Sequence, residues 1–453
     1  MTQPQNSHIA RNLIAVAMIA SAVGTRPAYA IPAFAAQTGE PCSACHIGFP
    51  QLTPYGREFK LEGYVAGGMF PDYKNFALMS EIGFTHVQNK VPGGLAPNYP
   101  SNNAWSVQQT SLFYGGALYA PIGLGAFIQA TYNGVGHSFS WDNTDIRLAR
   151  LTSLFHKPLF YGFTFNNNPG VTDLWNTPPA WGYPFLPDAL GGGPPAGVQL
   201  ASLGGQVMGL GGYGALNISL SDLLYAEANV YQSLPNNLGH TLGAGYNPIS
   251  GAIPYGRVAW QHSWASNSFE LGAIGLQDHP IPSGISHQQS DTKTDIGLDS
   301  QFQLISGTHA FSLQAAYVHE WQHLPASVAL GQASNMNNTL DTITLTASYL
   351  YRQKYGITET FSDLMGSADA NLYGLENGGD SVNGKPNTSS FTTELDYYPW
   401  NNGGPKFFPW ANAKFFVEGI VFPTYHGASS NYDGNGSSAN GHDLIFTGIW
   451  LAF

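Results

Sequence analysis

The chain has 453 residues, of which 43% are hydrophobic and only 10% are charged, whereas about 25% of the residues of an average soluble domain are charged. This composition argues against an ordinary cytosolic enzyme, and the longest apolar run is shorter than the roughly 18 residues that a membrane helix needs. Glycine (54 residues) and aromatic residues (13%) take the place of the charges. A long chain that is rich in aromatic residues and glycine but poor in charge is typical of a transmembrane β-barrel.

The first 30 residues have the pattern of a cleaved secretory signal peptide. Arg11 precedes an apolar stretch, residues 13–23, and the small-residue segment Ala28-Tyr29-Ala30 follows it. The stretch is too short to span a bilayer, which makes a membrane anchor the weaker interpretation. Cleavage removes two arginines and no acidic residue, so the formal net charge of −12 becomes −14. An acidic exported protein is a poor candidate for binding nucleic acid, and its natural small partners are cations.

The two cysteines of the chain, Cys42 and Cys45, are followed directly by His46. This spacing is the attachment motif of c-type haem, because two thiols on one turn can bond the porphyrin vinyl groups and the next histidine can reach the iron. A local disulfide would leave His46 without a role, and a thioredoxin-like pair would need βαβ surroundings that the sequence lacks. The motif therefore predicts one covalently attached haem c, with Cys42 and Cys45 as thioether anchors and His46 as the proximal ligand of the iron.

Residues 31–75, which contain the motif, are too few to build a core of useful size alone, so haem and a surrounding wall must supply the missing burial. Thr53, Pro54 and Gly63 predict a short helix with a threonine cap, a proline in its first turn and a glycine stop. Apolar residues near this helix can pack on the porphyrin face: Phe49, Leu52, Phe59 and Leu61.

From residue 76 to residue 453 the sequence alternates between segments of β-type composition and turn-rich stretches of Gly, Pro, Asn and Ser. Sixteen such segments begin near Phe76, Trp105, Ile122, Asp142, Pro158, Gly204, Leu223, Pro254, Ser268, Thr292, Thr308, Thr339, Tyr355, Thr388, Trp410 and Gly441. Links after odd-numbered segments are mostly long and links after even-numbered segments are mostly tight, as for extracellular loops and periplasmic turns. We therefore expect an all-β protein: a 16-stranded antiparallel barrel in the lipid of a Gram-negative outer membrane, with the helical haem segment as a plug inside the barrel or on its periplasmic side.

Alternation of side chains predicts which face of each strand contacts lipid. In the segment near Thr339, apolar Ile343 and Leu345 alternate with hydroxyl side chains, as expected for a lipid-facing and a lumen-facing set. A water-soluble sandwich could alternate in the same way, but the last segment ends at the aromatic Phe453, which resembles the outer-membrane assembly signal. The same parity places these charged residues on the lumen: Glu81, Asp145, Glu227, Glu394, Asp396 and Glu418, with Arg147 and Lys414 as counter-charges. Such a wall is either an ordinary wet lining or a means of drawing in metal cations.

The residues around the haem motif form one continuous pattern that resembles the outer-membrane fused monohaem cytochrome-porin family. The pattern comprises Phe34, Ala35, Gln37, Thr38, Gly39, Cys42 to His46, Phe49, Pro50, Leu52, Thr53, Pro54, Gly56, Arg57, Phe59, Lys60, Gly63 and Tyr64. Ala36 departs from it, since the family often has arginine there. The barrel offers no motif of its own. The resemblance implies an iron-oxidising electron-transfer cytochrome that takes electrons from extracellular ferrous iron and passes them through haem c to a periplasmic cytochrome c or cupredoxin.

The sixth ligand of the haem iron and the function are both left open at this stage. A methionine would raise the reduction potential, as an acceptor of electrons from iron requires; the nearest are Met69 and Met79, and for each of them ordinary packing is the competing interpretation. Weaker candidates are Met208, His86 and His262. A diffusion channel plugged by the haem segment is the alternative function, and electron transfer from a donor other than iron is another. A soluble peroxidase is disfavoured, because no separate distal His and Arg pair accompanies the motif.

Overall fold

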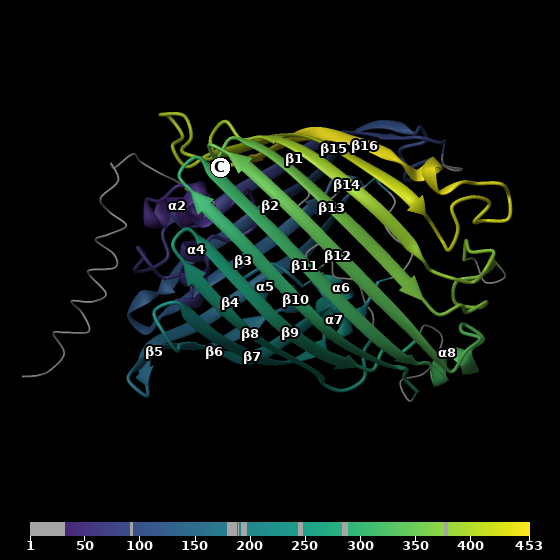
Figure 1. Cartoon of the computed structure of the whole chain (residues 1–453), viewed down its shortest axis with the longest axis horizontal. Helices are drawn as coiled ribbons and strands as arrows, with labels where there is room; N and C mark the ends of the chain where they lie inside the picture. The colour runs from purple at the N-terminus through teal and green to yellow at the C-terminus, as the bar shows by residue number, and fades with distance from the viewer. Residues whose placement is uncertain are drawn as a thin grey trace, which may run out of the picture.

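The computed structural model describes residues 32–453 except 91–93, 179–187, 189, 192–196, 243–247, 283–288 and 376–378. The predicted signal peptide, residues 1–30, lies outside the described residues. Sixteen antiparallel strands follow one another around a closed barrel in which β1 pairs with β16 (Figure 1). The predicted fold class is confirmed.

The strands begin within four residues of the predicted starts. Their bounds are β1 Phe76–Val87, β2 Asn103–Tyr119, β3 Leu124–Asn133, β4 Ser138–Leu154, β5 Lys157–Asn166, β6 Val207–Asn217, β7 Asp222–Ser233, β8 Ile253–Trp264, β9 Asn267–Asp278, β10 Thr292–Ser306, β11 His309–His323, β12 Asn337–Tyr351, β13 Tyr355–Gly366, β14 Thr388–Tyr397, β15 Asn412–Thr424 and β16 Leu444–Ala452.

Side chains alternate along the strands as the sequence predicts. Leu345 on β12 and Ile445 on β16 point outward and are 46% and 51% exposed, whereas Thr346 beside Leu345 is 2% exposed. The charged residues assigned to the lumen are buried inside the barrel: Glu81, Asp145, Arg147, Glu227, Glu394, Lys414 and Glu418. The outer surface is therefore apolar and the wall of the lumen is polar.

Helical segments lie at the end of the barrel that carries most of the tight turns (Figure 1). Residues 32–75, which we call the plug, contain α2 (Pro32–Thr38), α3 (Cys42–Cys45), α4 (Pro54–Leu61) and η1 (Tyr73–Asn75). α4 begins as predicted, since the Thr53 hydroxyl accepts a hydrogen bond from the Gly56 N–H at 3.2 Å. Figure 1 shows α2 and α4 at the end of the barrel where the chain terminates, opposite α8 (Pro325–Ala329). Within the described part of the chain, no helix has the length and apolar character needed to cross a membrane.

The links between strands follow the predicted alternation, with two exceptions. Tight turns such as 265–266 and 307–308 lie at the plug end, and longer links such as 324–336 and 425–443 lie at the other end. The link 134–137 is short although it lies at the end of the long loops, and 398–411 is long although it lies at the plug end. The link 398–411 bonds to the plug, because the Asn401 carbonyl accepts a hydrogen bond from the Ser43 N–H at 3.2 Å.

The first part of the long link between β5 and β6 folds into the lumen, although the length of the link alone suggested an extracellular loop. This first part, residues 167–178, which we call the inner segment, contains α5 (Pro169–Thr172). Asp173, Leu174 and Trp175 of this segment are fully buried. The remaining short helices among the described residues are η2 (Ala120–Ile122), α6 (Gln199–Ser202), α7 (Asn236–Thr241) and η5 (Ala439–His442). The plug and the inner segment thus enter the barrel from opposite ends.

Candidate haem site

The predicted haem ligands lie together on α3 and directly after it. Cys42 and Cys45 are 4% and 5% exposed and are not bonded to each other. The His46 N–H donates to the Cys42 carbonyl at 2.8 Å, which fixes the histidine at the end of the same turn. The His46 Nδ1 lies 3.1 Å from the Pro50 carbonyl oxygen. Because a carbonyl can only accept, Nδ1 carries the proton and Nε2 keeps the lone pair that a metal would use.

Burial sets the protonation of all three side chains. It lowers the pKa of His46 to about 4, so the imidazole is neutral at neutral pH and in the form that binds a metal. Burial raises the pKa of Cys45 to about 12 and that of Cys42 well above its ordinary value. Neither group is the stabilised thiolate that a thioredoxin-like redox pair requires.

Cys45 and His46 line a cavity with an aromatic wall. The Phe34 ring meets the Phe59 ring edge-on at 5.0 Å and stacks on Tyr64 at 5.5 Å, and all three rings line the same cavity. Cys42 lies outside the lining, one turn away, where its thiol interacts with the Asn412 side chain. A neutral imidazole, two adjacent thiols and an aromatic wall are the donor set and surroundings that haem c requires, so these residues fit the group.

Gly56 lets α4 pack directly on α3. A Cβ atom at this position would lie 2.4 Å from the Cys45 carbonyl oxygen, which is a backbone atom and cannot turn aside. Gly56 also lines the cavity beside Cys45 and His46. The glycine in the predicted pattern is therefore explained by the close approach of two backbones.

Two cations of α4 tie the plug to its surroundings, one to the wall of the barrel and the other to the inner segment. The Arg57 Nη1 donates to Gln303 Oε1 at 2.9 Å and to Gln301 Oε1 at 3.1 Å. The Lys60 Nζ donates to the Asp173 carbonyl at 2.6 Å. Burial lowers the pKa of Arg57 to about 10 and that of Lys60 to about 8. Sequence reasoning found both residues in the family pattern but gave neither a role.

The inner segment bonds to the same backbone carbonyl that orients the His46 ring. The Asn176 Nδ2 donates at 2.9 Å to the same Pro50 carbonyl that accepts from His46. The inner segment is itself fixed by Arg257, whose Nε lies 3.0 Å from Asp173 Oδ1 and whose Nη2 lies 2.7 Å from Asp299 Oδ2. Plug, inner segment and barrel wall therefore meet around His46.

The candidates for the sixth ligand are spread over the molecule. Met69 is 56% exposed, and Met79 is buried in a cluster with Ala33 and Trp450; neither lines the cavity beside His46. The remaining candidates lie on strands outside that lining: Met208 on β6, His86 on β1 and His262 on β8. The polar residues that share the cavity with His46 are Lys60, Tyr64 and Asn176, which sequence reasoning did not consider as ligands. The sixth ligand stays a prediction.

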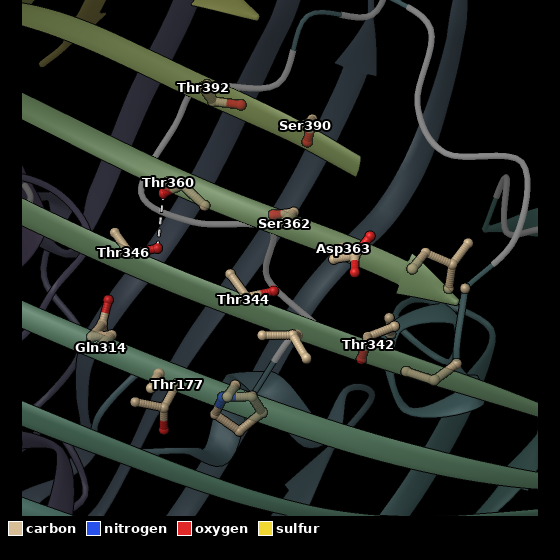
Figure 2. Close-up of a pocket in the computed structure, with 18 of the residues that line it drawn as sticks. Thr177, Gln314, Thr342, Thr344, Thr346, Thr360, Ser362, Asp363, Ser390 and Thr392 are labelled. Carbon is tan, nitrogen blue, oxygen red and sulfur yellow. Dashed lines mark hydrogen bonds between the residues drawn. The ribbon is translucent and has the colours of Figure 1, made fainter. Parts of the chain in front are cut away.

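A second cavity of about 340 Å³ lies between the inner segment and the barrel wall. Figure 2 shows its hydroxyl side chains on three neighbouring strands, and Thr346 and Thr360 bond to each other at 2.8 Å. The hydroxyl residues that line it from β12, β13 and β14 are Thr342, Thr344, Thr346, Thr360, Ser362, Thr388, Ser390 and Thr392. Asn176 and Thr177 of the inner segment line its other side. We call this space the hydroxyl cavity.

The barrel defines the class of the protein. A closed antiparallel barrel leaves no unpaired edge, and an apolar outer surface is what lipid requires; the chain has both. The protein is a porin-like β-barrel of a Gram-negative outer membrane.

No protein-family model matches the chain, and none of the curated proteins is similar to it in sequence. Solved structures with a similar barrel include a loop-deletion mutant of OmpT, an outer membrane protein of Vibrio cholerae, at 9% identity and a TM-score of 0.43 over 83% of this chain and 97% of that one. An anion-selective porin from Comamonas acidovorans is 12% identical, with a TM-score of 0.41 over 83% of this chain and 98% of that one. The outer membrane channel DcaP of Acinetobacter baumannii is 9% identical, with a TM-score of 0.44 over 85% of this chain and 99% of that one. At these values the similarity is one of general barrel architecture.

Proposed function

We propose that this outer-membrane barrel carries one haem c on Cys42, Cys45 and His46 and transfers electrons from an extracellular donor, ferrous iron, to a periplasmic cytochrome c or cupredoxin. The observation that carries the proposal is the position of His46. Its Nδ1 is bonded to the Pro50 carbonyl at 3.1 Å, and the ring lies beside Cys45 in an aromatic cavity. Metal-binding histidines are commonly oriented by such a bond from the second ring nitrogen.

The chain's residues would perform distinct tasks. When bound, haem c supplies a one-electron Fe(II)/Fe(III) couple. Cys42 and Cys45 anchor the group, and the Pro50 carbonyl fixes the ring orientation of His46. The aromatic rings of Phe34 and Phe59 would limit the access of water to the group, and a site with little water disfavours the more highly charged oxidised state. These residues therefore favour a raised reduction potential, which suits electrons arriving from ferrous iron.

Exposed residues near α3 favour electron transfer from the haem to a partner in the periplasm. α3 lies at the plug end of the barrel, and Tyr55 after it is 42% exposed. Glu40 and Glu58, which interact with Tyr55, are exposed as well. An acidic surface beside the haem motif would attract a basic redox partner.

The visible spectrum of the detergent-purified full chain tests the proposal. We expect c-type bands after reduction with dithionite, haem that stays with the protein after acidic acetone extraction, and rapid anaerobic reduction by ferrous iron. C42A/C45A should lose the covalent haem, whereas M336L, as a control at an exposed position far from the motif in sequence, should keep it. Absence of haem bands would refute the proposal. Reduction by dithionite but never by ferrous iron would leave a haem protein with a different donor.

A diffusion channel is the second candidate function. The porin-like barrel and the hydroxyl cavity of about 340 Å³ favour it directly, since porin lumens are polar and wet. Single-channel recording in a planar bilayer separates the two functions. A channel would pass ions with the plug in place, whereas a lumen occupied by plug and inner segment would not.

A further inference from the structure

Four carboxylates gather on the lumen wall across β14, β15 and β1. These residues, which we call the acidic cluster, are Glu81, Glu394, Asp396 and Glu418. Glu394 and Glu418 are directly opposite each other on paired strands, and each of Glu81 and Glu418 interacts electrostatically with Glu394. Lys414 bonds to Glu394 at 2.6 Å and to Asp396 at 3.1 Å. One ammonium group therefore faces four carboxyl groups.

Three oxygens of the acidic cluster are buried and have no partner in the part of the chain that the structure describes. Glu81, Glu394 and Glu418 are 0%, 1% and 2% exposed. Glu81 Oε1, Glu394 Oε2 and Glu418 Oε2 have no hydrogen-bond partner among the described residues. A buried carboxylate oxygen without a partner is costly, so water, a proton or a cation must compensate it.

The hydroxyl cavity borders the acidic cluster along β14. Ser390 and Thr392, which line that cavity, share the inner face of β14 with Glu394. Successive residues on one face of a strand are about 7 Å apart, so Thr392 is the immediate neighbour of Glu394 along the lumen. Hydroxyl groups can exchange hydrogen bonds with the water shell of an ion, and the neighbouring carboxylates supply the charge that attracts it.

An aromatic pair separates the acidic cluster from the haem motif. Trp450 on β16 is in register with Glu81 on one side and with Lys414 on the other. Its ring stacks on Phe49 at 5.5 Å, and the Phe49 ring lies 5.5 Å from the His46 ring. A cation at the acidic cluster would therefore lie one aromatic pair away from His46.

We propose that the acidic cluster is a binding site for a hydrated divalent cation. Carboxylate oxygens suit hard divalent ions. Within the described residues, no three His, Cys, Asp or Glu side chains converge closely enough to ligate an ion directly, so the ion keeps water in its shell and is held through it. Identification of this ion with the ferrous donor rests on the proposed function; binding of the ion does not.

Binding of Mn²⁺ to the full chain in detergent tests the site, because Mn²⁺ binds like Fe²⁺ without donating an electron. Free Mn²⁺ is measured by EPR at increasing concentration. We expect E81Q and E418Q each to weaken binding at least tenfold. The matched control is D278N, because Asp278 is also fully buried on the lumen wall, on β9, with carboxylate oxygens that lack partners among the described residues. D278N should bind Mn²⁺ like the unaltered protein.

Each outcome decides the proposal. Unchanged Mn²⁺ affinity in E81Q and E418Q would overturn the proposal, and so would loss of binding in D278N alone. An unaltered protein that binds no Mn²⁺ would also overturn it, because protons would then be what neutralises the acidic cluster. If one variant does not fold, the other decides, since the two residues lie on different strands. In protein that contains haem, E418Q should raise the KM for ferrous iron and leave reduction by dithionite unchanged. Failure of the proposed function is recognised separately, because the visible spectrum then shows no haem bands, whether or not the protein binds Mn²⁺.

Discussion

The carbonyl oxygen of Pro50 joins two parts of the chain that are far apart in sequence. It accepts from His46 Nδ1 at 3.1 Å and from Asn176 Nδ2 at 2.9 Å. A carbonyl has two lone pairs, so both bonds can form at once. The orientation of the histidine ring is therefore tied to the inner segment as well as to its own turn.

G56A should separate α4 from α3. The added Cβ would lie 2.4 Å from the Cys45 carbonyl oxygen, and overpacking against backbone costs about 1–3 kcal/mol. We expect faster proteolysis of the plug and a lower fraction of protein with covalent haem. The control is G419A on β15, where a Cβ meets nothing within 4 Å. Wild-type protease resistance in G56A would contradict the close approach of the two helices.

Glu62, the residue after α4, should make the plug less stable as the pH rises. Burial and the neighbouring Glu58 raise its pKa from 4.5 to about 7, and the negative end of the helix also disfavours its charge. A carboxyl group whose pKa is higher in the folded state favours folding when protonated, and this contribution is lost between about pH 4.5 and pH 7. The protection factors of the α4 amides, which correct each exchange rate for its base-catalysed intrinsic rate, should therefore be lower at pH 8 than at pH 5, and E62Q should remove most of the difference. An equal pH dependence in E62Q would assign the effect to other groups; E40Q, at an exposed position, controls for a general change of charge.

At the scale of the elements, the strands were predictable because the wall of a barrel repeats with a period of two residues. The outward Leu345 and the inward Thr346 were assigned from parity alone, and the structure confirms both. The inner segment could not be assigned in this way. Leu174 and Trp175 are buried by side chains of distant strands, and its Gly and Pro content is that of any loop. Whether a loop turns outward or into the lumen depends on long-range contacts.

Arg257 on β8 anchors the inner segment, and R257Q should detach it. Its guanidinium lies within 3.0 Å of Asp173, Glu270 and Asp299, and all four side chains are buried. Removing one partner from a buried charge network costs about 3–5 kcal/mol, because the remaining charges stay buried without compensation. Samples are heated in SDS to increasing temperatures before electrophoresis. We expect R257Q to lower the temperature at which the band of the folded form disappears. R150Q is the control, since Arg150 is exposed on β4. Equal gel transitions for R257Q and R150Q would contradict the anchoring role.

At the scale of the whole molecule, the sequence predicts the part of the candidate site that is contiguous. Cys42, Cys45 and His46 lie on one turn, so their spacing is enough to identify them. The surroundings of His46 are not contiguous, because Asn176 comes from the inner segment and Phe127 from β3. No local pattern marks such residues, which only the closure of the barrel around the plug brings together.

The same closure predicts how the molecule conducts ions. Arg57 ties the plug to Gln301 and Gln303 on β10, and Lys60 ties it to the Asp173 carbonyl of the inner segment. With these bonds in place the full chain should show only small or rare openings in a planar bilayer. R57M removes the donor to β10, and the two glutamines left behind can bond to each other or to water. We therefore expect R57M to open more often and to conduct several-fold more current, with the K385M variant of an extracellular-side lysine outside the plug as the control. Large steady currents from the unaltered protein, with haem in place, would mean that plug and inner segment leave an open path, and would favour the diffusion channel as the function of the barrel.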